Sequence, residues 1–227
     1  MTINGWNIEE AGGRQFKVTF GYHAVTTRSE WPPGARLPIL AENSLGFKPL
    51  QIVVVVKESG REMIRTSIST ILAHLTEPVE IVLDGMDHIF RGYLKKHTVQ
   101  EMSKKRWHVL TLDLEGCEYG EPVASSGTGS IEVWNRGTMP AQAVLKLTPP
   151  AGLSQLIVTG MDDEVTLTGI QSGEEIVIDS ENGLVTQGGS ILETDFTRFP
   201  ELPVGVVNLS CSNTLTGIQI EFRPRFM

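Results

Sequence analysis

The chain has 227 residues, of which 40% are hydrophobic and 20% charged, and its formal net charge is −8. These values are typical of a soluble globular protein that is long enough to form two domains without disulfide bonds. The longest apolar run, Ile52–Val56, has five residues, which excludes a membrane-spanning helix of roughly 18 residues. The first residues also lack the basic and apolar regions of a signal peptide.

The charge is distributed unevenly along the chain. Residues 1–127 contain 14 Lys and Arg against 15 Asp and Glu, a net charge of −1, whereas residues 128–227 contain 5 against 12, a net charge of −7. Because an acidic surface repels phosphates, we expect no direct binding to nucleic acid and no binding to a membrane. The two cysteines, Cys117 and Cys211, are far apart and are interpreted as buried thiols rather than as a disulfide or metal pair.

The first half begins with one short strand and a long stretch rich in proline. Residues 15–20 alternate between polar and apolar and predict the strand. Residues 26–49 contain Trp31-Pro32-Pro33-Gly34 and, further on, Arg36, and their prolines disfavour a helix. A structureless stretch of this length is uncommon in a compact domain, so we expect it to be functional, disordered or docked on something outside the protomer.

The rest of the first half predicts a small sheet with one helix packed on it. The β-branched run Ile52–Val56 is typical of a strand covered on both faces. Residues 61–75 predict the helix, because their apolar residues recur at the spacing of one helix face: Met63, Ile64, Ile68, Ile71, Leu72 and Leu75. Three strands follow, at residues 79–83, 88–94 and 107–115, and Asp84-Gly85 predicts a hairpin between the first two.

Residues 124–130 are small and uncharged and are interpreted as a linker, which divides the chain into domains 1–127 and 128–227. The second half contains six short alternating segments separated by turn residues, a pattern typical of a β-sandwich. Asn182-Gly183 predicts a type I′ turn. The predicted fold is mainly β: an N-terminal β-sandwich-like domain with one α-helix, followed by a C-terminal β-sandwich.

No catalytic motif is present, and no two of the five histidines have metal-ligand spacing. Asp84, Asp87 and His88 come nearest to a ligand cluster, but they fall in the predicted hairpin turn. The acidic loops at residues 162–164 and 179–181 are interpreted as solvated turns rather than calcium sites. We therefore predict no catalytic residue, no metal and no cofactor, and a protein that is not an enzyme. A hydrolase stays a third candidate, which turnover lost on changing one acidic residue would support.

A carbohydrate-binding β-sandwich is the alternative function. Sugar-binding sandwiches of the galectin type stack a tryptophan on the sugar and surround it with His, Asn and Arg. The second half has one tryptophan, Trp134, and neither Tyr nor His. Trp134 is interpreted as a residue of the core or of the packing between domains. Binding to a glycan array that is lost in Trp134→Ala would favour the alternative.

Several phrases of the second half, taken in order, resemble the distal tail proteins (Dit) of long-tailed phages, which are hub components of the baseplate. They are Trp134-Asn-Arg-Gly-Thr-Met-Pro140, Ile176-Val-Ile-Asp179 with Gly183-Leu-Val, and the ending from Phe196 to Phe226. In the first half, the helix, the hairpin at Asp84-Gly85 and the phrase Asp113-Leu-Glu-Gly-Cys-Glu-Tyr-Gly-Glu-Pro also fit. The resemblance implies that the C-terminal sandwich is galectin-like.

The resemblance also implies a structural function. Members look like hexameric rings that join the tail tube to the tail-tip protein, with N-terminal domains that build the ring. The expected partners are therefore other copies of this chain, the tail tube protein and the tail-tip protein, and the expected location is the virion tail after assembly in the host cytoplasm. The proline-rich composition of residues 26–49 suits an extended arm that orders on a neighbouring subunit, with Trp31, Pro32, Pro33 and Arg36 as interface residues; a disordered or self-packed loop is the alternative.

Overall fold

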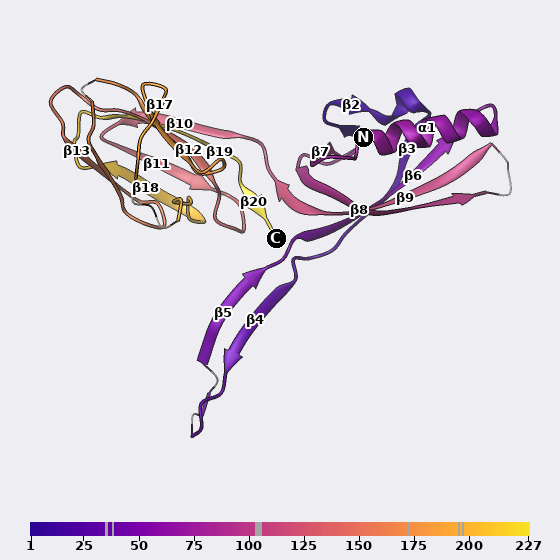
Figure 1. The fold of residues 1–227 in the computed structure, drawn as a ribbon, viewed down its shortest axis with the longest axis horizontal. Helices are drawn as coiled ribbons and strands as arrows, with labels where there is room; N and C mark the ends of the chain where they lie inside the picture. Colours follow the sequence, from indigo (N-terminus) through magenta and orange to yellow (C-terminus); the bar gives the residue numbers. More distant parts are fainter. Residues whose placement is uncertain (35, 38, 103–105, 172, 195, 197) are drawn as a thin grey trace. The chain divides into compact units, whose positions relative to one another are not determined.

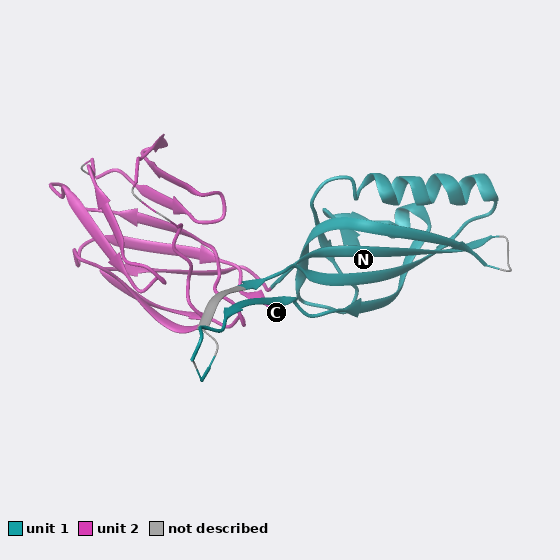
Figure 2. Cartoon of the chain, turned by 60° about the horizontal axis from the view of Figure 1, so that its bottom comes forward, with its two compact units in different colours: residues 1–119, 227 teal, residues 120–226 magenta. Residues whose placement is uncertain are grey.

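The computed structural model describes residues 1–34, 36–37, 39–102, 106–171, 173–194, 196 and 198–227, without the side chains of residues 39–43. Ala35 and Pro38 of the predicted arm, and Thr197 of the C-terminal phrase, lie outside the described residues. The chain divides into two units, Met1–Tyr119 with Met227, and Gly120–Phe226 (Figure 2). No helix among the described residues is long and apolar enough to cross a membrane.

The first unit is a curved antiparallel sheet that carries a helix on one face (Figure 1). Seven of its strands lie in the order β2-β1-β7-β8-β9-β6-β3. Its elements are β1 (Thr2–Ile3), β2 (Trp6–Asn7), η1 (Ile8–Ala11), β3 (Gly13–Phe20), β4 (Val25–Glu30), β5 (Ile39–Leu45), β6 (Lys48–Lys57), α1 (Arg61–Ala73), β7 (Val79–Val82), β8 (Ile89–Glu101) and β9 (Trp107–Tyr119).

Helix α1 forms where the apolar spacing predicts it, and Ile64, Ile68 and Ile71 are buried. Met63, expected on the same face, is 51% exposed, so that part of the prediction is wrong. The strand prediction for Ile52–Val56 is confirmed, but only one face is covered: Ile52, Val54 and Val56 are buried, while the residues between them are half-buried. The β-branched run therefore reflects β-propensity on the second face rather than a second packed layer.

The predicted irregular stretch contains two strands. Strands β4 and β5 pair with each other in a separate two-stranded sheet, from Val25↔Leu45 to Glu30↔Ile39. Prolines excluded a helix but did not exclude strands, because Trp31-Pro32-Pro33 lies in the connection between them and not inside a ladder. The arm is therefore a β-hairpin, drawn in Figure 1 as the pair β4–β5.

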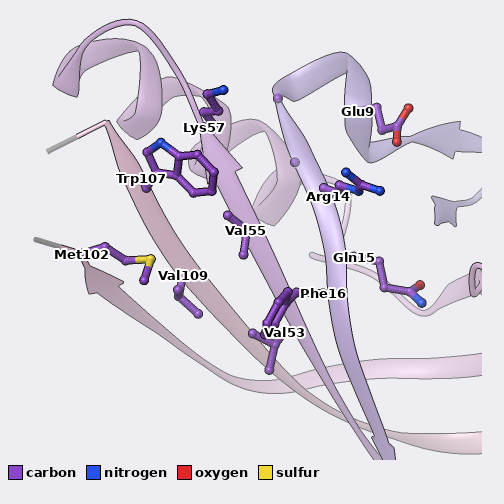
Figure 3. A pocket seen from close by; sticks show the side chains of 12 residues that line it. Glu9, Arg14, Gln15, Phe16, Val53, Val55, Lys57, Met102, Trp107 and Val109 are labelled. Carbon is purple, nitrogen blue, oxygen red and sulfur yellow. The ribbon is translucent and has the colours of Figure 1, made fainter. Parts of the chain in front are cut away.

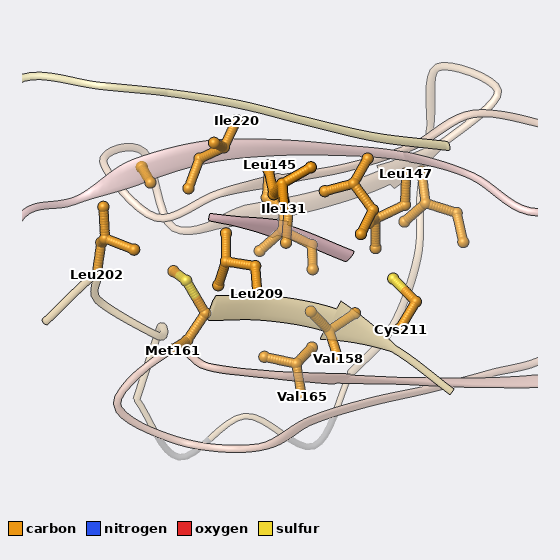
Figure 4. Packing of buried hydrophobic residues seen from close by; sticks show 14 of the residues in the cluster. Ile131, Leu145, Leu147, Val158, Met161, Val165, Leu202, Leu209, Cys211 and Ile220 are labelled. Atoms are coloured by element: carbon orange, nitrogen blue, oxygen red, sulfur yellow. The ribbon is translucent and has the colours of Figure 1, made fainter. Parts of the chain in front are cut away.

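The second unit contains a ten-stranded antiparallel arrangement in the order β14-β13-β18-β11-β10-β19-β12-β15-β16-β17. Its strands are β10 (Val123–Thr128), β11 (Ser130–Asn135), β12 (Ala143–Thr148), β13 (Gln155–Thr159), β14 (Val165–Thr168), β15 (Ile176–Asp179), β16 (Leu184–Gln187), β17 (Ser190–Ile191), β18 (Gly205–Cys211) and β19 (Gly217–Phe222); the short strand β20 (Arg225–Phe226) follows and is not part of this arrangement. Alternate residues point inward to one apolar core (Figure 4). The expected inward positions of the last long strand, Ile218, Ile220 and Phe222, are buried.

Residues 124–130 are not a linker. Strand β10 pairs with β19 over its whole length, from Val123↔Phe222 to Thr128↔Gly217. Small residues are needed here because the chain turns back sharply into β11: a Cβ on Gly127 would lie 2.5 Å from Ile131, and one on Gly129 would lie 2.6 Å from the Thr214 carbonyl oxygen. The same composition that is typical of a linker thus serves close packing.

The hairpin at Asn182-Gly183 is present, but its turn is not type I′. Strands β15 and β16 pair up to Asp179↔Leu184, so the loop has four residues. Gly183 has a φ of +66°, whereas Asn182 is not among the residues with positive φ. The Asp179 carboxylate accepts the backbone N–H groups of Glu181 and Asn182 at 3.0 and 2.9 Å, which holds the longer loop.

A buried asparagine, Asn135, forms hydrogen bonds with three backbone groups of the second unit. Asn135 is 1% exposed; its Nδ2 donates to the carbonyl oxygens of Met139 (3.3 Å) and Leu202 (3.2 Å), and its Oδ1 accepts the N–H of Gly137 (3.0 Å). The neighbouring Gly137 leaves no space for a side chain, since a Cβ would lie 2.5 Å from the Arg225 carbonyl oxygen.

Asn135→Ala should therefore lower the free energy of unfolding by about 1–3 kcal/mol, because three backbone groups each lose a hydrogen bond to this side chain. Urea unfolding followed by circular dichroism measures the change. Asn208→Ala, on an exposed position of β18, is the matched control and should change stability little. Equal stability of the two variants would contradict the assignment.

Neither cysteine forms a disulfide. Cys211 is buried, as expected, and burial raises the pKa of its thiol to about 11. Cys117 is only half-buried.

Candidate functional site

The arm continues the main sheet of the first unit. Strands β3 and β6 pair up to Phe20↔Leu50, the Gly21 N–H donates to the Pro49 carbonyl oxygen (2.8 Å), and the Gly46 N–H donates to Ala24 (2.8 Å) before β4 and β5 begin. The sheet and the arm are thus one long β-ribbon. Every side chain of β4 is exposed, so the described part of the arm has no core of its own.

The four predicted interface residues lie together at the tip of the arm. Trp31, Pro32, Pro33 and Arg36 all belong to the connection between β4 and β5. Trp31 is 67% exposed, and Leu37, which the sequence reasoning did not single out, is 76% exposed. Large apolar side chains at an exposed loop tip are typical of a surface that is covered in an assembly.

A buried histidine holds the base of the arm. His23 is 7% exposed, and its Nδ1 lies 2.5 Å from the Gly46 carbonyl oxygen. A carbonyl oxygen only accepts, so the Nδ1–H group of the imidazole donates. Phe47 packs edge-on against Tyr93 with ring centres 5.8 Å apart. The ribbon is therefore fixed to the sheet on both strands where the arm begins.

Directly beyond the arm, Lys48 begins β6 and enters a buried ion-pair cluster. Lys48 is 6% exposed; its Nζ pairs with Glu118 and donates to the Met227 carbonyl oxygen at 2.8 Å. The other carboxylate oxygen of Glu118 lies 2.6 Å from Nδ1 of His88. Burial acts to raise the pKa of Glu118, but the hydrogen bonds from Lys48 and His88 outweigh it and hold this pKa below its ordinary value.

The sheet of the first unit has two outer edges beside its long strands. Among the described strands, β3 pairs only with β6. Beyond Gly92, where the pairing of β8 with β7 ends, β8 pairs only with β9 among the described strands. Each edge carries one bulge, between Gln15 and Lys17 and between Leu94 and Lys96. Outward backbone groups along such edges can accept another strand.

The face of this sheet away from α1 is open and hollowed (Figure 3). A depression of about 930 Å³ lies over β3, β6 and β9. Its apolar lining comes from Phe16, which is 75% exposed, from Val53 and Val55, and from Trp107, whose ring lies 5.2 Å from Nζ of Lys57. An apolar depression that no second layer of the protein covers is more typical of a surface that contacts another molecule than of one that stays exposed to water.

The acidic residues considered as ligands are used within the fold. Asp84 pairs with the N-terminal amine, and His88 pairs with Glu118, so Asp84, Asp87 and His88 form no cluster. Asp162 pairs with Arg198 and accepts the Glu201 N–H at 2.6 Å. No group of three or more His, Cys, Asp or Glu side chains among the described residues is arranged to hold a metal.

Comparison with known proteins agrees with this architecture. The family described as "Siphovirus-type tail component, C-terminal domain" matches residues 136–226. No curated protein matches the sequence. The crystal structure of the Dit protein of phage SPP1 is similar with a TM-score of 0.77 at 13% identity, over 99% of this chain and 98% of that one. Two structures of the phage P2 baseplate in its activated conformation, with Ca and with Sr, match with TM-scores of 0.49 at 10% identity, over 96% and 95% of this chain and 92% of each matched chain.

Residues 136–226 are thus similar to the tail component domain of siphovirus type, and the whole chain is similar in fold to the SPP1 Dit protein. The resemblance to the distal tail protein family, predicted from the ordered phrases of the sequence, is confirmed. The mainly β fold with one α-helix is confirmed as well.

Proposed function

We propose that this chain is a structural hub of a phage baseplate, whose copies form a hexameric ring that connects the tail tube to the tail-tip apparatus. The observation that carries the proposal is the long β-ribbon of the first unit, with its arm and its two unpaired outer edges. The SPP1 Dit protein, which shares the fold, is described as a paradigm of the hub adsorption apparatus in phages that infect Gram-positive bacteria.

The two sheet edges support closure into a ring. Strand β3 and the outer part of β8 lie at opposite edges of the four strands β8-β9-β6-β3. Pairing β3 of one copy with β8 of the next uses two different surfaces, and a head-to-tail contact of this kind generates a ring when its rotation closes. Backbone hydrogen bonds would supply the affinity, as in other strand additions.

The arm supports contact between neighbouring copies. A two-stranded hairpin alone is only marginally stable in water, and the arm adds exposed Trp31 and Leu37 at its tip. We propose that the tip, with Trp31, Pro32, Pro33 and Arg36, packs on an adjacent subunit. The entropic cost of ordering the hairpin is then offset by apolar burial in the ring.

The proposed partners are therefore a second copy of this chain, the tail tube protein and the tail-tip protein, and the proposed location is the virion tail after assembly in the host cytoplasm. The role is structural and not enzymatic. The net charge of −7 on residues 128–227 supports repulsion between the C-terminal domains of adjacent copies, which keeps them soluble.

Light scattering and negative-stain microscopy test the ring. We expect a particle of six copies with a central hole, and a strict monomer at tens of micromolar, alone and with the tube protein, would refute the hub.

Hydrogen exchange tests whether the two sheet edges pair in the ring. In the assembled ring, amides of β3 and of residues 93–101 should exchange more slowly than in a monomeric variant. Rapid exchange at both edges of an intact ring would refute edge pairing.

A further inference from the structure

The chain contains two Asn-Gly pairs, and the structure holds their asparagines in different ways. Asn4-Gly5 is the two-residue turn between β1 and β2, with φ angles of +49° and +79°. Asn182-Gly183 ends the four-residue loop between β15 and β16. Because glycine has no Cβ, its backbone nitrogen is unhindered and can attack the side-chain amide of the asparagine before it. Both asparagines are exposed, so accessibility alone does not distinguish them.

Asn4 is fixed to a strand of the first unit. Its backbone N–H donates to the Glu80 carbonyl oxygen, and its side-chain oxygen accepts the Glu80 N–H, both at 2.8 Å. Glu80 belongs to β7, which pairs with β1 on one side and with β8 on the other. The side chain of Asn4 is therefore released only when the turn separates from a paired strand of the sheet.

Asn182, in contrast, is held by one carboxylate at the end of its own loop. Its backbone N–H donates to Oδ1 of Asp179 at 2.9 Å, and its Nδ2 donates to Oδ2 at 2.8 Å. Because one carboxylate binds both groups, the amide is kept beside the Asn182 N–H and not beside the nitrogen of Gly183. Within the described part of the chain, the Gly183 N–H donates no hydrogen bond to the backbone. This nitrogen is thus exposed to solvent, and only the position of the amide protects the pair.

We infer that Asn182 is a site of spontaneous deamidation and that Asp179 sets its rate, a modification independent of the proposed hub. When Asp179 releases the amide, the side chain can turn toward Gly183. The nitrogen of Gly183 loses its proton to solvent and attacks Cγ of Asn182. The Cγ–Nδ2 bond then breaks, and Nδ2 leaves as ammonia with a proton taken from water. Water opens the resulting cyclic imide at either carbonyl carbon and yields aspartate or isoaspartate, so the sum consumes one water, releases one ammonia and changes no oxidation state.

The product alters the loop that contains it. A carboxylate at position 182 would face Asp179 at the place where Nδ2 now lies 2.8 Å from Oδ2. Two carboxylates this close repel each other, so the bonds that hold the loop would weaken. Gly183 also packs beside Phe199, because a Cβ on Gly183 would lie 3.4 Å from that ring, and Phe199 packs against the second core. The effect of the modification therefore extends beyond the exposed loop.

Peptide mapping by mass spectrometry, after incubation of the full chain in mildly alkaline buffer, tests the inference. Deamidation is expected at Asn182 before Asn4. Asp179→Ala should deamidate at Asn182 about tenfold faster, corresponding to the loss of a hydrogen bond to a charged group. Asp179→Asn keeps one acceptor oxygen and should react at an intermediate rate. Glu175→Ala is the matched control, since Glu175 is an exposed carboxylate directly before β15, and its rate at Asn182 should be unchanged.

The rate at Asn4 reports whether each variant is folded, because it should be the same in all folded chains. If Asp179→Ala also accelerates the reaction at Asn4, that variant has lost its fold, and Asp179→Asn decides. The inference is overturned if Asn4 reacts first in the folded chain, if the folded Asp179 variants react no faster than the unchanged chain, or if Glu175→Ala accelerates the reaction equally. Each result is independent of ring formation, which light scattering measures separately.

Discussion

Removal of the arm should abolish the ring while leaving a folded chain. Replacing residues 25–45 by Asn-Gly would join Ala24 directly to Gly46 through a tight turn. These two residues already share a backbone hydrogen bond of 2.8 Å, so the ribbon would close where it is paired. Among the side chains of the removed segment that the structure describes, none belongs to either hydrophobic core. Light scattering should then report a monomer, and circular dichroism should show a folded β protein that lacks only the contribution of β4 and β5.

Point variants locate the effect within the arm. Trp31→Ser combined with Leu37→Ser should weaken assembly strongly, because both exposed apolar side chains at the tip are lost. Leu215→Ser is the matched control: Leu215 is 71% exposed in the second unit and should leave assembly unchanged. An arm-deleted chain that still forms six-membered rings would show that the arm has no part in ring formation.

Lys48→Met should destabilise the first unit by about 1–3 kcal/mol, because a partly buried carboxylate loses one of its partners. The substitution keeps most of the side-chain volume but leaves the carboxylate of Glu118 largely buried with His88 as its remaining partner. It also removes the donor to the Met227 carbonyl oxygen. Urea unfolding at pH 7 measures the loss. The exposed Lys95→Met, which breaks a surface pair with Glu115, is the control and should leave the free energy of unfolding almost unchanged.

The same cluster gives a dependence on pH. Because the pKa of Glu118 in the folded chain is below its ordinary value, its contribution to stability is present above that ordinary value of 4.5 and is lost as the pH falls through the folded pKa. Acidification below 4.5 should therefore destabilise the unchanged chain more steeply than Glu118→Gln. Parallel pH profiles for the two chains would contradict a role for this carboxylate.

For the first unit, sequence patterns predicted which segments form the helix and the strands more reliably than they predicted which faces of those elements are buried. The 3.6-residue spacing placed α1, since it reports directly which side faces a core. The spacing alone could not show that Met63 is exposed, because the burial of a residue at the margin of an apolar stripe depends on which groups pack beside it. Likewise Ile52–Val56 predicted a strand, but only the tertiary structure shows that its second face is open.

Small and proline-rich segments were the least predictable. Residues 124–130 have the composition of a linker, yet β10 is paired along its length with β19, nearly a hundred residues later in the sequence. Residues 26–49 have the prolines of an irregular loop, yet half of them belong to the paired strands β4 and β5. The composition of a short segment indicates how flexible that segment is by itself. Its pairing with a strand far away in the sequence depends on residues outside the segment.

The candidate site was predicted only in part. Tryptophan and prolines drew attention to the arm tip, and the structure brings these residues into one connection. No local signal identified Lys48 and Glu118 as partners, because they are 70 residues apart and meet through the pairing of β6 with β9. Trp134 was interpreted as a residue of the core or of the packing between domains, whereas its position on β11 puts it outside the core.

The hydrogen bond between Ala24 and Gly46 closes the base of the arm, so the length of the arm can change without disturbing the sheet of the first unit. Residues can be added to or removed from the hairpin beyond this pair without altering the register of β3 against β6. Changes of one residue on each strand would turn the side chains at the tip to the opposite face, while changes of two would preserve it. The reach of the arm, and with it the diameter or partner that it suits, can therefore evolve in steps while the core stays constant.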